Sequence, residues 1–161
     1  MTAVRIIALG VLVLLLLPII AVDIRERRIP NGLNALLAVV GLAFQFATAP
    51  TLGAALTGLI APLAIILVFL LLILAMKLMK RPGTLGLGDV KFLAAASIWV
   101  GFVGSTAVFV LASLLALGFT LARAPWQTLD MRAAIPFSPF LAVGLMLVFA
   151  AGATPGPMGL G

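Results

Sequence analysis

Long apolar runs separated by short clusters of charge are the feature that most limits what this sequence can fold into. Of its 161 residues, 65% are hydrophobic and only 9% are charged, whereas a soluble domain is about half apolar and about a quarter charged. Ten basic and four acidic side chains cannot cover this much apolar surface in water, so the solvent must be lipid. A membrane-crossing helix takes about 20 residues, which leaves room for roughly six spans and for no soluble domain.

Hydropathy and helix-breaking residues mark where these predicted spans begin and end. Gly101 and Gly104 predict a tight turn after the fourth span, and Pro62 removes a backbone donor within the third, where it can kink the helix. We therefore expect an all-α integral membrane protein, a bundle of about six transmembrane helices that forms one domain over residues 1–161. The predicted spans are Val4–Val22, Leu33–Ala49, Leu52–Met76, Asp89–Phe102, Ser105–Leu121 and Pro136–Ala151.

The basic residues predict the orientation of these spans. Of the ten, only Arg5 lies on one side of the membrane in this arrangement. Because connections rich in Lys and Arg stay in the cytoplasm, we expect both termini to be periplasmic or external. The other nine, which fall on the cytoplasmic side, are Arg25, Arg27, Arg28, Lys77, Lys80, Arg81, Lys91, Arg123 and Arg132.

Two residue types that support much of enzyme chemistry are missing, since the sequence contains no Cys and no His. Disulfides, thiol or histidine nucleophiles and the usual zinc sites are excluded, and we expect neither a metal nor a cofactor. The formal net charge of +6 lies in the short connections, as in other membrane proteins. The expected partner is therefore the lipid bilayer and not a nucleic acid.

The acidic residues are Asp23, Glu26, Asp89 and Asp130, and the predicted topology places all of them on the cytoplasmic side. Asp23 ends the first span and Asp89 begins the fourth, so helix packing can bring the two carboxylates together. Charged groups at membrane depth are costly and are interpreted as functional by default. Two carboxylates facing one water can share a single proton and hydrolyse an amide, one removing a proton from the water and the other polarising the carbonyl.

Several alternatives to this carboxylate pair remain open. Asp89 can simply cap its helix, and Asp23 can be an interfacial residue paired with the neighbouring arginines. Glu26, three residues after Asp23, is the main rival for the second catalytic carboxylate, while Asp130 has the surroundings of a surface residue. A small transporter or channel with Asp23 and Asp89 as ion or proton ligands is a function of another class, and a structural subunit is a third.

Three sequence elements resemble the type IV prepilin peptidases. Gly86-Leu87-Gly88-Asp89-Val90-Lys91 is similar to the GxGD element of that family. Asp23 with Ile29-Pro30-Asn31 resembles its first aspartate segment, and Ile135 to Ala142 resembles the proline-rich stretch that leads into its last helix. The three elements stand in the family's order.

The resemblance implies an aspartic endopeptidase of the bacterial or archaeal inner membrane. Such enzymes remove the short basic leader of prepilins and pseudopilins at the cytoplasmic face, and the residues that match their catalytic aspartates are Asp23 and Asp89. We expect the substrate's apolar helix to lie among the spans. The residues expected to shape the substrate site are Gly86, Gly88, Glu26, Lys91, Pro30 and Asn31.

Longer bacterial members of the family carry an N-terminal segment with a cysteine-rich loop, which is linked to methylation of the new N-terminus. This sequence begins at its first span and contains no Cys. The comparison predicts a peptidase-only enzyme without the methylase segment. Small residues such as Gly41, Gly53, Gly58 and Ala61 allow close helix packing, either with the substrate helix or within the protein itself.

Overall fold

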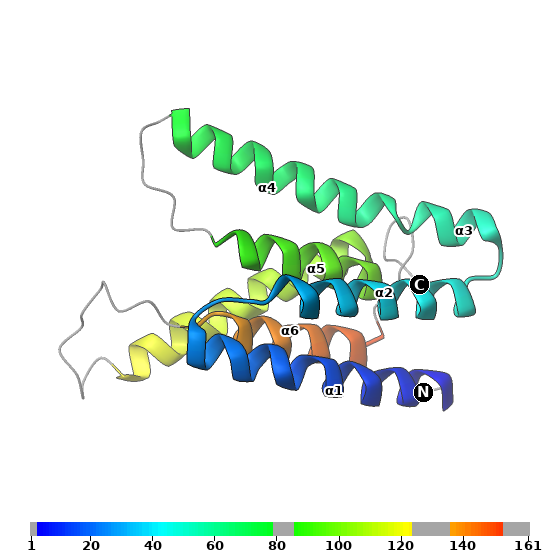
Figure 1. Cartoon of the computed structure of the whole chain (residues 1–161), viewed down its shortest axis with the longest axis horizontal. Coiled ribbons are helices and arrows are strands. Elements are labelled where there is room, and N and C mark those ends of the chain that lie inside the picture. The colour runs from blue at the N-terminus through cyan, green and yellow to red at the C-terminus, as the bar shows by residue number, and fades with distance from the viewer. Residues whose placement is uncertain (1–2, 79–85, 124–135, 153–161) are drawn as a thin grey trace.

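The computed structural model describes residues 3–78, 86–123 and 136–152, and every regular element in these ranges is a helix. The stretches long and apolar enough to cross a membrane are Ala3–Glu26, Asn31–Thr48, Leu52–Leu78 and Leu87–Ala122. The chain is therefore a multi-pass, all-helical membrane protein, as predicted, while the count of six spans and the external termini stay predictions. The helices, shown in Figure 1, are α1 (Ala3–Glu26), α2 (Asn31–Thr48), α3 (Leu52–Thr57), α4 (Ile60–Leu78), α5 (Leu87–Arg123) and α6 (Ser138–Ala150).

Helix α5 reverses direction at Gly101, where the backbone leaves the helical region with φ 72° and ψ −177°. Three positions along α5 show the reversal. Asp89, at the start of α5, lines the same cavity as Phe137 just before α6, and Trp99 lies 5.7 Å from Phe149 near the end of α6. Phe109 then lies 6.4 Å from Phe137 again. The first arm of α5, residues 87–100, and the second arm, residues 102–123, therefore run in opposite directions (Figure 1). The turn predicted here is confirmed at Gly101, because only glycine adopts such a φ without strain.

The predicted third span is interrupted just before Pro62, as the proline predicts. The break between α3 and α4 falls at Gly58 and Leu59, whereas Pro62 lies in the first turn of α4. A proline is tolerated in a first turn because its missing N–H would have no intrahelical partner there. At Gly58 a side chain would collide with Gln45, whose amide Nε2 donates a hydrogen bond to the carbonyl of Ala55. Pro62 has no N–H to donate to the carbonyl of Gly58, four residues earlier, so the break lies where the proline disrupts the helix. The absence of a side chain at Gly58 leaves room for Gln45 at that break.

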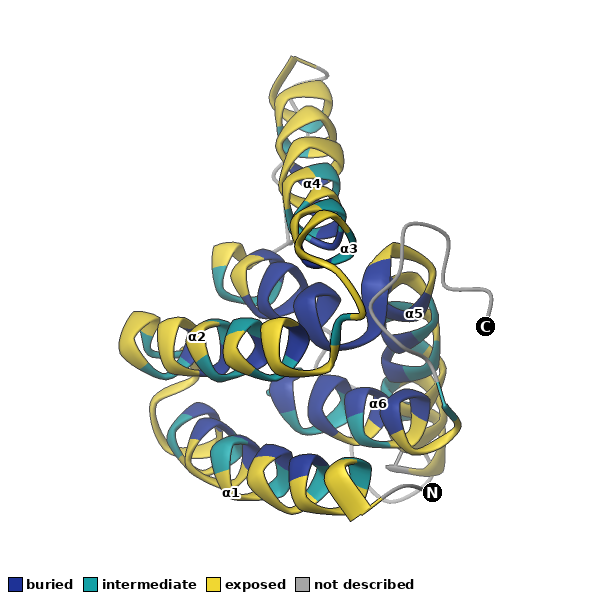
Figure 2. Ribbon diagram, turned by 90° about the vertical axis from the view of Figure 1, so that its right-hand side faces the viewer, coloured by how far each residue is buried: buried dark blue, intermediate teal, exposed yellow. Residues whose placement is uncertain are grey.

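The first arm of α5 lies at the centre of the core. Every residue from Phe92 to Gly101 is buried, which requires neighbours on all sides of that arm. Helices α2, α4 and α6 each pack against α5, and α1 packs against α2 and α6, whereas α2 and α4 do not contact each other. Figure 2 shows the result, with buried residues gathered at the centre and α4 extending from the bundle with most of its surface exposed. Exposed apolar faces of this kind suit a lipid environment.

Trp99 fixes the packing of α2 against α5. Its indole stacks on Phe44, with ring centroids 5.6 Å apart and an interplanar angle of 14°, and its Nε1 donates a 3.0 Å hydrogen bond to the carbonyl of Leu37. A Cβ atom at Gly41 would lie 2.5 Å from that same Nε1. Gly41 is therefore engaged by packing within the protein, as Gly58 is, so neither of these small residues is free to receive a substrate helix.

Substitution of Gly41 tests this packing. We expect Gly41→Ala to destabilise the protein by about 1–3 kcal/mol, because the indole is held on two sides and cannot move to admit a methyl group. Gly10→Ala is the matched control, since a Cβ at that helical position meets nothing within 4 Å. Thermal unfolding in detergent, followed by circular dichroism, gives the comparison. A Gly41→Ala protein as stable as the Gly10→Ala protein would contradict the assignment.

Candidate active site

Asp23 lies in the last turn of α1 and is held by the start of α6. Its side chain is only 6% exposed, and its Oδ2 accepts a 3.1 Å hydrogen bond from the backbone N–H of Ser138. Ser138 is the first residue of α6, and the first N–H groups of a helix have no partners within it. The positive end of the α6 dipole also favours a negative charge there. The proline-rich stretch therefore includes the start of α6, and this helix end binds the carboxylate of Asp23.

Asp89 lies in the first turn of α5 and is half-buried. Its backbone N–H donates a 3.0 Å hydrogen bond to the carbonyl of Gly86. A Cβ at Gly86 would lie 2.9 Å from Asp89 Oδ2, whereas one at Gly88 would lie 3.5 Å from Ile29, an ordinary contact. Neither glycine has a positive φ. Gly86 therefore provides room for the carboxylate, and neither residue provides an unusual backbone angle.

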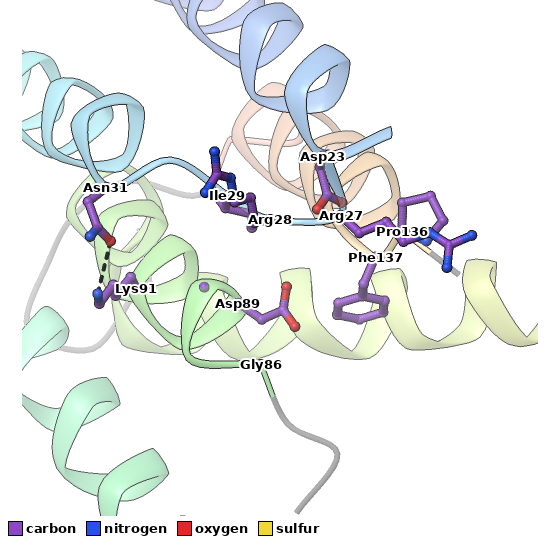
Figure 3. A pocket seen from close by; sticks show the side chains of 11 residues that line it. Asp23, Arg27, Arg28, Ile29, Asn31, Gly86, Asp89, Lys91, Pro136 and Phe137 are labelled. Carbon is purple, nitrogen blue, oxygen red and sulfur yellow. Dashed lines mark hydrogen bonds between the residues drawn. The ribbon is translucent and has the colours of Figure 1, made fainter. Parts of the chain in front are cut away.

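The two aspartates face the same cavity. In Figure 3 the carboxylates project from the end of α1 and the start of α5 into one space, beside the ring of Phe137. The cavity has a volume of about 280 Å³, and helix ends that are distant in the sequence form its walls. Its lining residues are Asp23, Arg27, Arg28, Ile29, Asn31, Gly86, Gly88, Asp89, Lys91, Pro136 and Phe137.

Two of the residues expected at the site do not line this cavity. Glu26 instead forms a 2.7 Å ion pair with Arg28, and its side chain is 47% exposed. Pro30 precedes α2 as its N-cap, and its carbonyl accepts a 3.2 Å hydrogen bond from the N–H of Asn34. The structure therefore brings together Asp23 and Asp89 and leaves Glu26 outside, while Asp130 lies outside the described residues.

Lys91 and Asn31 connect α5 to α2 beside the aspartates. The Lys91 Nζ donates a 2.9 Å hydrogen bond to Asn31 Oδ1, drawn as a dashed line in Figure 3. Lys91, Arg27 and Arg28 bring three cations to a cavity that holds two carboxylates. Within the described ranges, no group of three or more Asp, Glu, His or Cys residues could hold a metal ion.

Arg27 has a role that the sequence did not indicate. Its φ of 52° is in the left-handed region, and its N–H donates a 2.8 Å hydrogen bond to the carbonyl of Asp23. A left-handed residue directly after a helix is a common way to end it, although glycine usually occupies that position. Helix α1 therefore ends at Glu26, the residue before Arg27, and the chain that follows passes beside the cavity.

Long apolar helices and a pair of aspartates at one end of the bundle define a multi-pass membrane protein with a carboxylate site. The chain belongs to the type IV leader peptidase family, whose sequence model matches residues 10–121. The matched range includes both aspartates and both glycines of the cavity. No solved structure gives a significant match.

Curated relatives carry the name prepilin leader peptidase/N-methyltransferase. The relative from Pectobacterium carotovorum subsp. carotovorum is 33% identical over 138 residues, which cover 84% of this chain and 48% of the relative. The one from Dickeya chrysanthemi is 33% identical over 124 residues, covering 76% and 43%. The one from Burkholderia pseudomallei (strain 1026b) is 31% identical over 131 residues, covering 80% and 41%. The chain therefore spans less than half the length of these relatives.

The left-handed turn predicts an unusual response to substitution at Arg27. We expect Arg27→Gly to leave the thermal stability unchanged or raised, because glycine adopts a positive φ without strain. Arg27→Val is expected to lower stability by about 1–2 kcal/mol, because a β-branched side chain crowds this conformation. The same two substitutions at Arg28, which has no positive φ, form the control pair. Equal effects of glycine at the two positions would show that the turn is not strained.

Proposed function

We propose that this protein is an aspartic endopeptidase that removes the short basic leader from type IV prepilins or prepilin-like proteins at the cytoplasmic face of a bacterial or archaeal inner membrane. One observation carries the proposal: Asp23 and Asp89 face a single cavity. Membership of the type IV leader peptidase family and the names of the curated relatives support the same activity and the same class of substrate.

In the proposed reaction, one water lies between the two carboxylates. Because two like charges that face one water repel each other, the proposed pair shares a single proton. The ionised carboxylate accepts a proton from the water as its oxygen attacks the scissile carbonyl carbon, and the protonated carboxylate donates a hydrogen bond to the carbonyl oxygen. Collapse of the tetrahedral intermediate breaks the C–N bond, and a proton from the pair passes to the leaving amine.

The contacts of Asp23 suggest how the water is placed. The N–H of Ser138 engages Oδ2, so we assign the other oxygen, Oδ1, to the water. A backbone donor at the start of a helix is a rigid partner, because its position is set by the packing of α6 rather than by a rotating side chain. Such positioning is a large part of what an active site contributes to a rate.

In the proposed topology this cavity lies at the cytoplasmic face of the membrane. The two arms of α5, which reverse at Gly101, count as two spans, and α6 completes six. Basic residues stay on the cytoplasmic side, and three of them line the cavity. Both termini are then external. The position of the aspartates at helix ends argues against a transporter, because transporters hold their ions near the middle of the membrane.

Neutralisation of each carboxylate tests the proposed pair. We expect Asp23→Asn and Asp89→Asn each to reduce leader removal by about 1,000-fold or more, because either change removes half of the acid–base pair. The measurement is co-expression with a candidate prepilin and a gel shift, at matched membrane levels. Glu26→Gln is the control and is expected to cleave normally, since Glu26 does not line the cavity. Cleavage that survives in either Asp variant would rule out the two-aspartate mechanism.

The two glycines before Asp89 should differ in their tolerance of a methyl group. We expect Gly86→Ala to reduce the cleavage rate by about tenfold or more, because the new Cβ lies too close to Asp89 Oδ2 and displaces it. Gly88→Ala meets only an ordinary contact with Ile29 and is expected to retain more activity. Initial rates on the same prepilin give the comparison, with thermal stability measured for both variants. A greater loss in Gly88→Ala would mean that Gly88 has a direct role in holding the substrate.

A further inference from the structure

A second cavity lies beside the aspartates, between α2 and α4. These two helices both pack on α5 but do not contact each other, and in Figures 1 and 2 the first arm of α5 lies between them. The resulting groove has a volume of about 540 Å³. Ala35 and Ala38 line it from α2, Ile66 and Leu70 from α4, and Ala94 and Ile98 from α5. Its walls are thus almost entirely apolar.

The groove adjoins the aspartate cavity, and two residues are shared between them. Asn31 and Lys91, which are hydrogen-bonded to each other, line both cavities. Along α5 the groove extends from Leu87 to Ile98, a length of roughly 16 Å at the rise of an α-helix. A segment that enters the groove from the aspartates can therefore lie along it for about three helical turns.

Three polar residues line the groove, and of these only Asn34 is buried, since Asn31 and Lys91 are exposed. Asn34 is 5% exposed, and neither its Nδ2 nor its Oδ1 has a hydrogen-bond partner among the described residues. Leaving such a group unpaired costs about 1–3 kcal/mol, so the amide calls for a partner with both a donor and an acceptor. A lipid acyl chain has neither. A polypeptide backbone has both, and it offers them where the chain is extended and makes no helical hydrogen bonds of its own.

We infer that this groove holds the apolar segment that follows the scissile bond of the substrate, and that the Asn34 amide pairs with the substrate's main chain near that bond. The inference rests on the proposed function, because it places the cleaved bond at Asp23 and Asp89. Hydrolysis requires an extended backbone at the bond that breaks, and such a backbone has a free N–H and C=O. Beyond the bond, the substrate continues as an apolar helix between α2 and α4. Asn34 is thus a positioning residue.

The test uses two synthetic probes and a matched pair of variants. Both probes contain a basic leader, a glycine and the residues next to the scissile bond, but only the long probe continues as an apolar segment of about 20 residues. Ala35→Phe fills the groove from an exposed position of α2. Ala43→Phe is the control on the same helix, also exposed, and Ala43 lines neither the groove nor the aspartate cavity.

We expect Ala35→Phe to raise the KM of the long probe about tenfold with kcat little changed, because it removes binding that is made equally before and during the reaction. The short probe, and both probes with Ala43→Phe, should change by less than about twofold. Asn34→Leu should lower cleavage of both probes while thermal stability stays unchanged or rises, since it removes an unpaired buried amide. Equal KM values for the Ala35→Phe and Ala43→Phe proteins, or normal cleavage by Asn34→Leu, would overturn the inference.

A binding readout separates this inference from the proposed function. Because the sequence contains no Cys, Ala35→Cys and Ala43→Cys each provide a single thiol for crosslinking to a thiol-reactive group on the apolar segment of the long probe. The groove predicts crosslinking at Ala35→Cys and not at Ala43→Cys, even in the Asp89→Asn background. If the wild-type protein cleaves neither probe, the proposed function fails while the crosslink still tests the groove. Equal crosslinking at the two positions, or a groove that keeps a bound lipid and excludes the probe, would refute the inference.

Discussion

The fit of the Trp99 indole against Gly41 is the contact on which the rest of this structure depends. It fixes how α2 lies on α5, because the indole is also stacked on Phe44 and bonded to a backbone carbonyl of α2. Since helices are nearly rigid rods, a register set at one end determines what meets at the other. There Lys91 meets Asn31, and the cavity forms beside them. Phe149 packs edge-on against the same indole, which places α6 as well, so one aromatic cluster aligns three helices.

The end of the bundle that holds the two aspartates is subject to a second constraint, the free-energy cost of placing carboxylates at membrane depth. The structure lowers that cost with a helix N-terminus rather than with a dedicated buried ion pair, since Oδ2 of Asp23 accepts its hydrogen bond from the backbone of α6. The cations that line the cavity are Lys91, near the start of α5, and Arg27 and Arg28, in the chain that follows α1. A carboxylate that accepts one backbone hydrogen bond, and no bidentate contact from an arginine, has its second oxygen available for another hydrogen bond. The groove beside it has the opposite character, since its lining is apolar except for Asn31, Asn34 and Lys91.

The helices and the two aspartates could be located from the sequence, because apolar runs and the charged residues beside them are local patterns. A charged residue beside an apolar run is conspicuous, and so is a glycine pair before it. What the sequence could not resolve depends on contacts between distant segments. Glu26 shares a helix with Asp23, yet a left-handed turn at Arg27 that no local pattern indicates leaves Glu26 paired with Arg28 outside the cavity. Pro62 indicated the break after α3, but no local pattern indicated that Gln45, from another helix, packs against Gly58 there.

The reversal at Gly101 also has a consequence for how the protein is made. The arm of α5 before it, Leu87–Val100, carries Asp89 and Lys91 and is shorter than the roughly 20 residues of a self-sufficient membrane span. Such a segment has little affinity for a bilayer when it leaves the ribosome alone. Joined by one glycine to the long apolar arm that follows, it can partition as half of a helical hairpin. By pairing with the first arm in this hairpin, the second arm contributes to membrane insertion as well as to architecture, since the first arm is too short to span a bilayer by itself.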